Sequence, residues 1–458
     1  MEPPGLTRRD LLRAAAATTG ALLVSPYLLP QQSAEAAAGS SIRLADAEAA
    51  AQRVLVMAQR AVYFGSRGVG GLIMDNRSGR VIAEGRNNRY RRVNSAVASI
   101  PDEVLTWDYT AHGETGLVKW YFANRRRLRL PAPSRLTIVT TLDPCAMCTG
   151  SILTAGFSVA TIALDPTGGM NLGGDGAYAT LGPGLRAAAQ SASGLYAIDG
   201  QRTYIGPADI PLSDTAVTGP TADGCASVFF GAASKKLNPW DDVPVADLVD
   251  PLSLPGTSPA LKAMRKAWPH AFAVRLDNPR EPTRELHALL TRLVRANPGA
   301  RNAVGFIDPF GNLLSASADT PHISPIATAF MNASESYART RFDLFNGVRT
   351  HQGARRSLTE PSHGTFVWLH APSPGEAATI KDLGAYGSSI GRRSPGSFQY
   401  FLSPRGGSID ALRAQIALLP PYYTEKVGID PVRVGTHAAR AASHARRDDT
   451  PLPYPAYP

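Results

Sequence analysis

Three side chains in the first third of the chain have the types and the spacing of a metal site. They are His112 and the two cysteines of the run Pro144-Cys145-Ala146-Met147-Cys148. One imidazole and two thiolates suit zinc, and three protein ligands leave the fourth tetrahedral position open for water. An open position is typical of a catalytic zinc site rather than a structural one. The sequence therefore predicts a catalytic zinc site formed by His112, Cys145 and Cys148.

A carboxylate follows the candidate histidine ligand by two residues. Glu114 is too close to His112 for both side chains to bind one metal from the same helical face. A carboxylate beside an activated water can instead move a proton to a ring nitrogen and then to a departing amine. The pattern H-x-E followed by P-C-x-x-C, with Cys145 placed 31 residues after Glu114, is that of zinc-dependent nucleobase deaminases. We therefore predict that Glu114 is the catalytic acid and base.

Three segments resemble the cytidine/deoxycytidylate deaminase superfamily, within it the branch of tRNA adenosine, guanine and cytosine deaminases. The family patterns T-A-H-A-E, L-E-P-C-x-M-C and E-G-x-N are similar to the segments 110–114, 142–148 and 84–87. The resemblance covers about residues 45–170 and implies a three-layer α-β-α fold, bound zinc and hydrolytic deamination. It also implies that Asn87 hydrogen-bonds the substrate base or ribose. Gly113 and Asp143 depart from the family's Ala and Glu, which bears on substrate choice.

Each assignment has a plainer alternative. A purely structural zinc would need a fourth ligand, and the sequence offers none nearby. Glu114 could be a solvated helix residue, and Asn87 could be a turn residue at the end of a strand. Trp107 and Tyr109 could stack on a base, or they could pack in the core or at the rim.

The elements that must position these residues alternate between strand and helix. The apolar spacing predicts helices over 47–64, 111–124 and 148–155, and strands over 69–75, 80–85, 135–142 and 159–164. The first two strands form a hairpin through a Ser78-Gly79 turn. Such alternation predicts a three-layer α/β domain.

A fainter copy of this order follows in the second half of the chain. It predicts helices over 286–295, 326–337 and 375–383, and strands over 303–308, 313–318 and 365–370. Self-similarity at so long a period predicts a duplicated fold.

The copy lacks the residues that carry the chemistry. Thr328 and Phe330 align with His112 and Glu114, and the segment 374–378, aligned with 144–148, contains no cysteine. We therefore expect one zinc per chain. The second copy resembles the inactive partner subunit of the eukaryotic tRNA deaminase heterodimer, which implies that it pairs with the first copy within one chain. A homo-oligomer is a further possibility.

The N-terminus has the pattern of an export signal. Arg8 and Arg9 precede a weakly apolar run, and small residues offer cleavage after Ala36 or Ala38. The paired arginines resemble a twin-arginine signal, so we expect a periplasmic or extracellular protein. An uncleaved membrane anchor is the alternative, although the apolar run is interrupted and a span needs about 20 apolar residues. We expect no stable membrane insertion.

Five segments follow from these observations. They are a signal at 1–38, a deaminase domain at 42–236, a proline-rich linker at 237–259, a degenerate deaminase-like domain at 260–445 and a flexible tail at 446–458.

The composition excludes several protein classes. Of 458 residues, 44% are apolar and 18% are charged, so the chain can bury a large core and is neither disordered throughout nor a coiled coil. Three cysteines exclude a disulfide scaffold. The net charge of +10 includes two arginine clusters that could meet phosphates or form solvated faces. The clusters are Arg86, Arg89, Arg91 and Arg92, and Arg125, Arg126, Arg127 and Arg129.

These observations together predict a zinc-dependent deaminase that replaces an amino group on a nucleobase, nucleoside or related small molecule with an oxo group. Zinc would lower the pKa of its bound water towards about 7, and ammonia would leave. A tRNA adenosine deaminase acting on nucleic acid is the first alternative, although an export signal argues against it. A non-catalytic, zinc-containing binding protein is the second.

Overall fold

The structure is a computed structural model. It describes residues 34–36, 42–99, 102–165, 167–171, 178–198, 212, 215–234, 243–278, 281–389, 399–403, 409–420 and 429–431. The expected twin-arginine pair and the tail at 446–458 lie outside these residues. No helix within the described part of the chain has the length and apolar character needed to cross a membrane.

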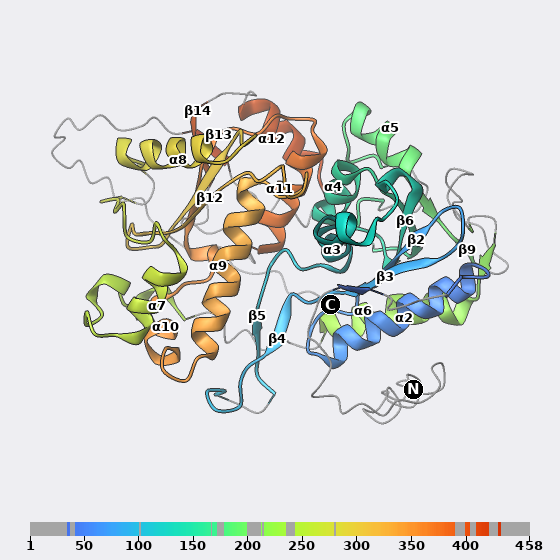
Figure 1. Cartoon of the computed structure of the whole chain (residues 1–458), viewed down its shortest axis with the longest axis horizontal. Coiled ribbons are helices and arrows are strands. Elements are labelled where there is room, and N and C mark those ends of the chain that lie inside the picture. The colour runs from blue at the N-terminus through green and yellow to red at the C-terminus, as the bar shows by residue number, and fades with distance from the viewer. Residues whose placement is uncertain are drawn as a thin grey trace, which may run out of the picture.

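The first half is built on a sheet whose strand order is β1-β3-β2-β6-β7-β8 (Figure 1). Strand β2 is antiparallel to both β3 and β6, and β7 and β8 continue the sheet parallel to β6. The strands are β1 (Ala34–Ala36), β2 (Gly70–Asp75), β3 (Val81–Arg86), β6 (Leu136–Leu142), β7 (Ser158–Ala163) and β8 (Ser193–Leu195). Strand β1, which pairs with β3, contains the expected cleavage site Ala34-Glu35-Ala36.

Helices cover both faces of this sheet. Leu72 and Met74 of β2 pack with α2 (Ala47–Tyr63) and α6 (Gly219–Ser234) on one face. The intervening Ile73 packs with α3 (Gly113–Leu128) and α4 (Ala146–Ala155) on the other. Because alternate residues of a strand point to opposite faces, this split confirms the predicted three-layer α-β-α arrangement.

The second half contains a sheet with the order β12-β11-β13-β14-β15. Strand β11 is antiparallel to β12 and β13, and β14 and β15 continue parallel to β13. This is the order and direction of β3-β2-β6-β7-β8. The register shift between Ile73 and Met74 also recurs, between Phe306 and Ile307. The strands are β11 (Ala303–Ile307), β12 (Leu313–Ala318), β13 (Thr365–His370), β14 (Gln399–Ser403) and β15 (Ile429–Pro431).

Helices again flank the sheet of the second half. Val367 and Leu369 pack with α8 (Arg284–Ala296), whereas Phe366 and Trp368 pack with α9 (Ala329–Asn346) and α11 (Ala377–Ser389). The prediction of a helix over 326–337 was wrong at both ends, because Thr328 is the N-cap of α9 and the helix continues to Asn346.

The sequence patterns did not predict several shorter elements. These are α5 (Pro183–Ala192), α6, α7 (Pro259–Ala267), α10 (His351–Ser357), α12 (Ile409–Ala417), the pair β4 (Tyr90–Arg92) and β5 (Val104–Thr106), and the pair β9 (Ala197–Ile198) and β10 (Ala216–Val217). The described part of the expected linker, 243–259, is packed against the second half. Within it Pro251 is buried, and Asp250 accepts from Asn312 Nδ2 at 2.9 Å and pairs with Arg275 at 2.9 Å.

The two halves meet where α4 packs against α11, side by side near the middle of Figure 1. Two glycines allow the helix backbones to approach closely. A Cβ atom on Gly150 would lie 2.4 Å from the backbone nitrogen of Lys381, and one on Gly384 would lie 2.1 Å from that of Met147. The helix that carries both candidate cysteine ligands is therefore also the contact between the halves.

Candidate metal centre

Two helix N-termini bring the three predicted ligands together. His112 is the N-cap of α3, and Cys145 is the N-cap of α4, one turn before Cys148. One ligand atom from each of the three side chains lies within 4.8 Å of the others, and Cys145 Sγ lies 3.5 Å from His112 Nδ1. An imidazole and two thiolates at this separation suit tetrahedral zinc. No other such group of three ligands occurs among the residues that the structure describes.

The environment of the two thiols differs. Hydrogen bonds from Cys148, assisted by His112, hold the pKa of Cys145 well below its ordinary value, so its thiolate is favoured. Burial raises the pKa of Cys148, which is 1% exposed. A bound cation would stabilise the thiolate form of both, because metal ligation requires deprotonated cysteine.

Glu114 lies beside the ligands and is shielded from solvent. It is 3% exposed; its Oε1 accepts from Thr140 Oγ1 at 3.0 Å, and its Oε2 accepts from Cys148 Sγ at 3.3 Å. Burial raises the pKa of Glu114, and the nearby Cys145 adds to the rise. The idea of a solvated helix residue is therefore wrong, and the carboxylate is placed to exchange a proton at the ligand cluster.

Asn87 lies at the wall of the same cavity. It directly follows β3, is 2% exposed, and its Oδ1 accepts from Ser66 Oγ at 2.7 Å and from Arg89 N at 3.0 Å. Its Nδ2 makes no hydrogen bond with the described residues, while the side chain lines the cavity. The amide is therefore held by its oxygen and presents two N–H donors.

The cavity above these residues has a volume of about 370 Å³. It is lined by the five predicted site residues together with Arg67, Val69, Arg89, Leu142, Asp143, Asp165, Thr167, Gly168, Phe229 and Phe230. Phe229 and Phe230 could not be predicted from the sequence, because α6 carries many small residues and no amphipathic pattern. Their rings meet edge to face, with centroids 5.3 Å apart, and form an aromatic wall.

Trp107 and Tyr109 do not line the cavity. Trp107 lies between two guanidinium groups, with Arg91 Cζ 3.2 Å and Arg339 Cζ 4.4 Å from the ring centroid. Tyr109 is 1% exposed and donates to Glu360 of the second half. The packing alternative therefore holds for both residues.

The second half anchors the segment that leads to His112. Asp108 is fully buried, and its Oδ2 accepts from Arg339 Nε at 3.0 Å and Nη2 at 2.9 Å. Its Oδ1 accepts from both the backbone and the side chain of Thr110 at 2.7 Å. Burial alone would raise the pKa of Asp108, but the charges of Lys119 and Arg339 outweigh it and lower the pKa. A cation of the second half thus fixes the approach to the first metal ligand.

The two arginine clusters have different surroundings. In the first, Arg86 stacks on Phe64 with Cζ 4.3 Å from the ring centroid, and burial lowers the pKa of Arg91 to about 10. The second cluster closes α3, far from the N-cap His112: at about 1.5 Å per residue, Arg126 is about 20 Å along the helix from the ligands. Only Arg89 of the eight lines the cavity.

The corresponding positions of the second half cannot hold the metal. Thr328 is the N-cap of α9 with φ −74° and ψ 162°, close to the −70° and 158° of His112. Phe330 then occupies the place of Glu114. The alignment of 374–378 with 144–148 is one residue out, because α11 begins at Ala377 and Glu376 therefore takes the place of Cys145.

Comparisons with known proteins found one family and several solved structures that are similar to this chain. The family described as the cytidine and deoxycytidylate deaminase zinc-binding region matches residues 44–164. No curated protein matches the chain. A guanine deaminase from Nitrosomonas europaea is 19% identical, over 46% of this chain and 94% of that chain, with a TM-score of 0.24. A tRNA:A34 deaminase studied for A-to-I editing at the wobble position is 25% identical, over 26% and 77%, with a TM-score of 0.19.

The family match includes all five residues predicted for the site. At these TM-scores the two solved structures do not indicate a substrate for this chain. Residues 44–164 are therefore similar to the zinc-binding region of the cytidine and deoxycytidylate deaminases.

Proposed function

We propose that the protein is a zinc-dependent hydrolase that deaminates a nucleobase, a nucleoside or a related small molecule and releases ammonia. The observation that carries this proposal is the meeting of His112, Cys145 and Cys148 within 4.8 Å, beside the buried carboxylate of Glu114. His112, Cys145 and Cys148 would hold one zinc ion per chain. Zinc, when bound, supplies Lewis-acid activation of water.

The chain's own residues account for the remaining requirements. Glu114, shielded from solvent, would carry one proton from the attacking water to the ring nitrogen, and a second proton from the added hydroxyl group to the leaving amine. Asn87 would orient the ring by donating from Nδ2, since its Oδ1 is already held by Ser66. Phe229 and Phe230 would limit the width of the ring that enters. The cavity of about 370 Å³ is at the lower end of ligand-site volumes, which favours a base or nucleoside.

The direct test is ammonia release by the purified, zinc-loaded chain across free bases, nucleosides and RNA. We expect turnover of a base or nucleoside, abolished by chelation and restored by zinc. If the chain binds one zinc but turns over none of these compounds, the alternative of a non-catalytic, zinc-containing binding protein is favoured.

A nucleic-acid substrate is the second candidate, favoured by the positive charges of Arg67 and Arg89, which line the cavity. A protein that makes many phosphate contacts loses affinity steeply as salt rises, whereas a neutral base is nearly insensitive. If tRNA binds in a salt-sensitive way and no free base is turned over, a nucleic-acid substrate is favoured over a free base.

We also propose export through the twin-arginine-type signal, with the mature chain starting at Ala37 or Gly39. N-terminal sequencing of protein recovered outside the cytoplasm tests this, and an intact Met1 on a cytoplasmic pool would contradict it. The shared strand order of the two sheets further supports a duplication in which the second copy pairs with the first.

A further inference from the structure

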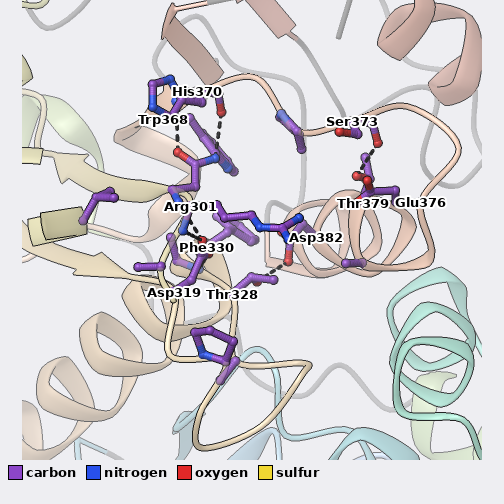
Figure 2. A pocket seen from close by; sticks show the side chains of 18 of the residues that line it. Arg301, Asp319, Thr328, Phe330, Trp368, His370, Ser373, Glu376, Thr379 and Asp382 are labelled. Atoms are coloured by element: carbon purple, nitrogen blue, oxygen red, sulfur yellow. Dashed lines mark hydrogen bonds between the residues drawn. The ribbon is translucent and has the colours of Figure 1, made fainter. Parts of the chain in front are cut away.

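A second cavity lies in the second half, at the position that corresponds to the metal centre. Its volume is about 760 Å³, against about 370 Å³ for the first. Figure 2 shows its floor, which Thr328 and Phe330 reach from the start of α9, Asp382 from α11 and Trp368 from β13. The cavity thus uses the same elements as the first site but none of its ligands.

Asp382 is the buried polar group of this floor, with 8% of its surface exposed. Its Oδ1 accepts from Thr328 Oγ1 at 2.6 Å and from Lys381 Nζ at 2.5 Å. Its Oδ2 makes no hydrogen bond with any residue in the described ranges, although the side chain lines the cavity. Since carboxylate oxygens accept hydrogen bonds, Asp382 Oδ2 is an unused acceptor in the cavity.

Two further polar side chains of the cavity are already engaged. Both oxygens of Asp319 are used, Oδ1 by Ala329 N at 2.8 Å and Oδ2 by the backbone nitrogens of Arg301 and Asn302. Thr379 Oγ1 donates to Ser373 O at 2.7 Å. Of the three side chains, Asp382 is therefore the one that keeps an acceptor for a ligand's donor group.

The cavity is lined by apolar as well as polar residues. In its floor, the rings of Phe330 and Trp368 stack with centroids 4.9 Å apart and planes at 15°, and Pro325 and Ala378 add apolar surface. Arg301 and Glu376, of opposite charge, are exposed at the mouth. A volume of this size lies within the range of small-molecule sites, which are mostly apolar with a few placed polar groups.

We propose that the second-half cavity binds a small heteroaromatic compound whose amino group donates to Asp382 Oδ2. The ring lies against the apolar residues of the floor, and the bound compound is not transformed, because Phe330 stands where the first half has Glu114. This proposal does not depend on the reaction proposed for the first site, since it invokes none of that site's residues.

The test is a calorimetric titration of the full, zinc-loaded Glu114→Gln chain with adenine and with 6-methylpurine. The two bases have nearly the same size and share the imidazole N–H, but 6-methylpurine carries a methyl group where adenine carries its amino group. We expect adenine to bind the second-half site at least about tenfold more tightly, because a methyl group cannot donate to Asp382. Equal binding of the two bases to wild type and variants would overturn the assignment.

Variants assign the binding to this cavity. Ala378→Phe fills the cavity without changing the Lys381–Asp382 pair, whereas Ala414→Phe adds the same ring to an exposed position of α12. We expect Ala378→Phe to weaken adenine at this site about tenfold or more and Ala414→Phe to leave it unchanged. His112→Ala removes the first site only, so adenine binding that survives it but is lost in Ala378→Phe supports the proposal. Adenine binding unaffected by Ala378→Phe would sink it.

Discussion

The two halves of the molecule share a strand order and have a cavity at the same point of it, but different side chains line the two cavities. In the first half, helix N-caps present His112 and Cys145, with Cys148 one turn further on. In the second half, the N-cap of α9 is Thr328, whose Oγ1 accepts from the fully buried ammonium of Lys381 at 2.7 Å. The first half has ligands for an external cation, and the second half supplies a cation of its own.

This difference indicates which features belong to the fold and which to the chemistry. Both halves keep the hairpin, the crossover helices and the polar residue after the hairpin, which is Asn87 in one and Asp319 in the other. Asn87 keeps a free donor that faces the cavity, whereas the carboxylate of Asp319 satisfies backbone N–H groups. The scaffold therefore positions helix N-termini in both halves, but only the first half leaves unused groups around a metal-ligand set.

The largest effect on turnover is expected at Glu114, because the second half has Phe330 and no carboxylate at that position. Glu114→Gln keeps the shape and the bond from Thr140 but cannot carry a proton, so turnover should fall at least 10²–10⁴-fold. Zinc content and the melting temperature should change little. Ammonia release and elemental analysis are to be measured side by side, with Glu281→Gln, an exposed carboxylate of the second half, as control. Near-wild-type activity of Glu114→Gln would contradict the proton-transfer role.

The metal site itself gives the next effect. Cys148→Ala should reduce zinc from about one per chain to nearly none, and lower stability by the linked binding energy, about 2.7 kcal/mol at zinc 100-fold above Kd. Cys225→Ala is the matched control, because Cys225 is similarly buried but belongs to α6 and packs in the cluster that includes α2. Two tightly held metals in the wild-type chain would mean that the second half also binds one.

Acidification gives the same site a second test. Each ligand must lose its proton to bind the metal, so zinc should dissociate as the pH falls. Zinc retention followed from pH 8 to pH 4 with a colorimetric chelator measures this, and retention that is independent of pH would speak against thiolate ligation.

The contact between the halves should have a smaller effect. Arg339→Gln removes the charge that pairs with the buried Asp108, four residues before His112. We expect about a tenfold loss of zinc affinity and about 1.5–3 kcal/mol of stability, because the charged hydrogen bonds are lost. The Asp108 contribution exists at pH above about 4, where its carboxyl is charged in the unfolded chain, and disappears as the pH falls through its lowered folded value. Arg349→Gln, exposed just beyond α9, is the control. If Arg339→Gln leaves the zinc affinity unchanged, this contact with the second half does not contribute to metal binding in the first half.

Local patterns predicted the main strands and helices of the first half and indicated which side chains meet, for physical reasons. Zinc ligation restricts residue types and spacing strongly, so the pattern pointed to four side chains, and the buried strand β2 contains the apolar run Leu72-Ile73-Met74. The aromatic wall from α6 could not be predicted, because the distant segment that carries Phe229 has no spacing linked to the motif. The buried pair Asp108–Arg339 joins residues 231 positions apart, and no local pattern encodes that contact.

The smallest effect is expected for the arginines that close α3. Arg126 and Arg127 are exposed, and about 20 Å of helix separates Arg126 from His112. Their charges are screened over about 8–10 Å at physiological salt, so the double change to Gln should alter turnover of a base or nucleoside by less than about twofold. If tRNA is the substrate and these residues contact phosphates, the same change should reduce the slope of log affinity against log salt by about one to two. Turnover of a nucleoside and of RNA is to be measured for the wild-type chain and for the double variant at 50 mM and 200 mM salt. This measurement decides between a small-molecule substrate and tRNA. A large loss on a neutral nucleoside would mean that the far end of α3 is coupled to the metal centre through the helix itself.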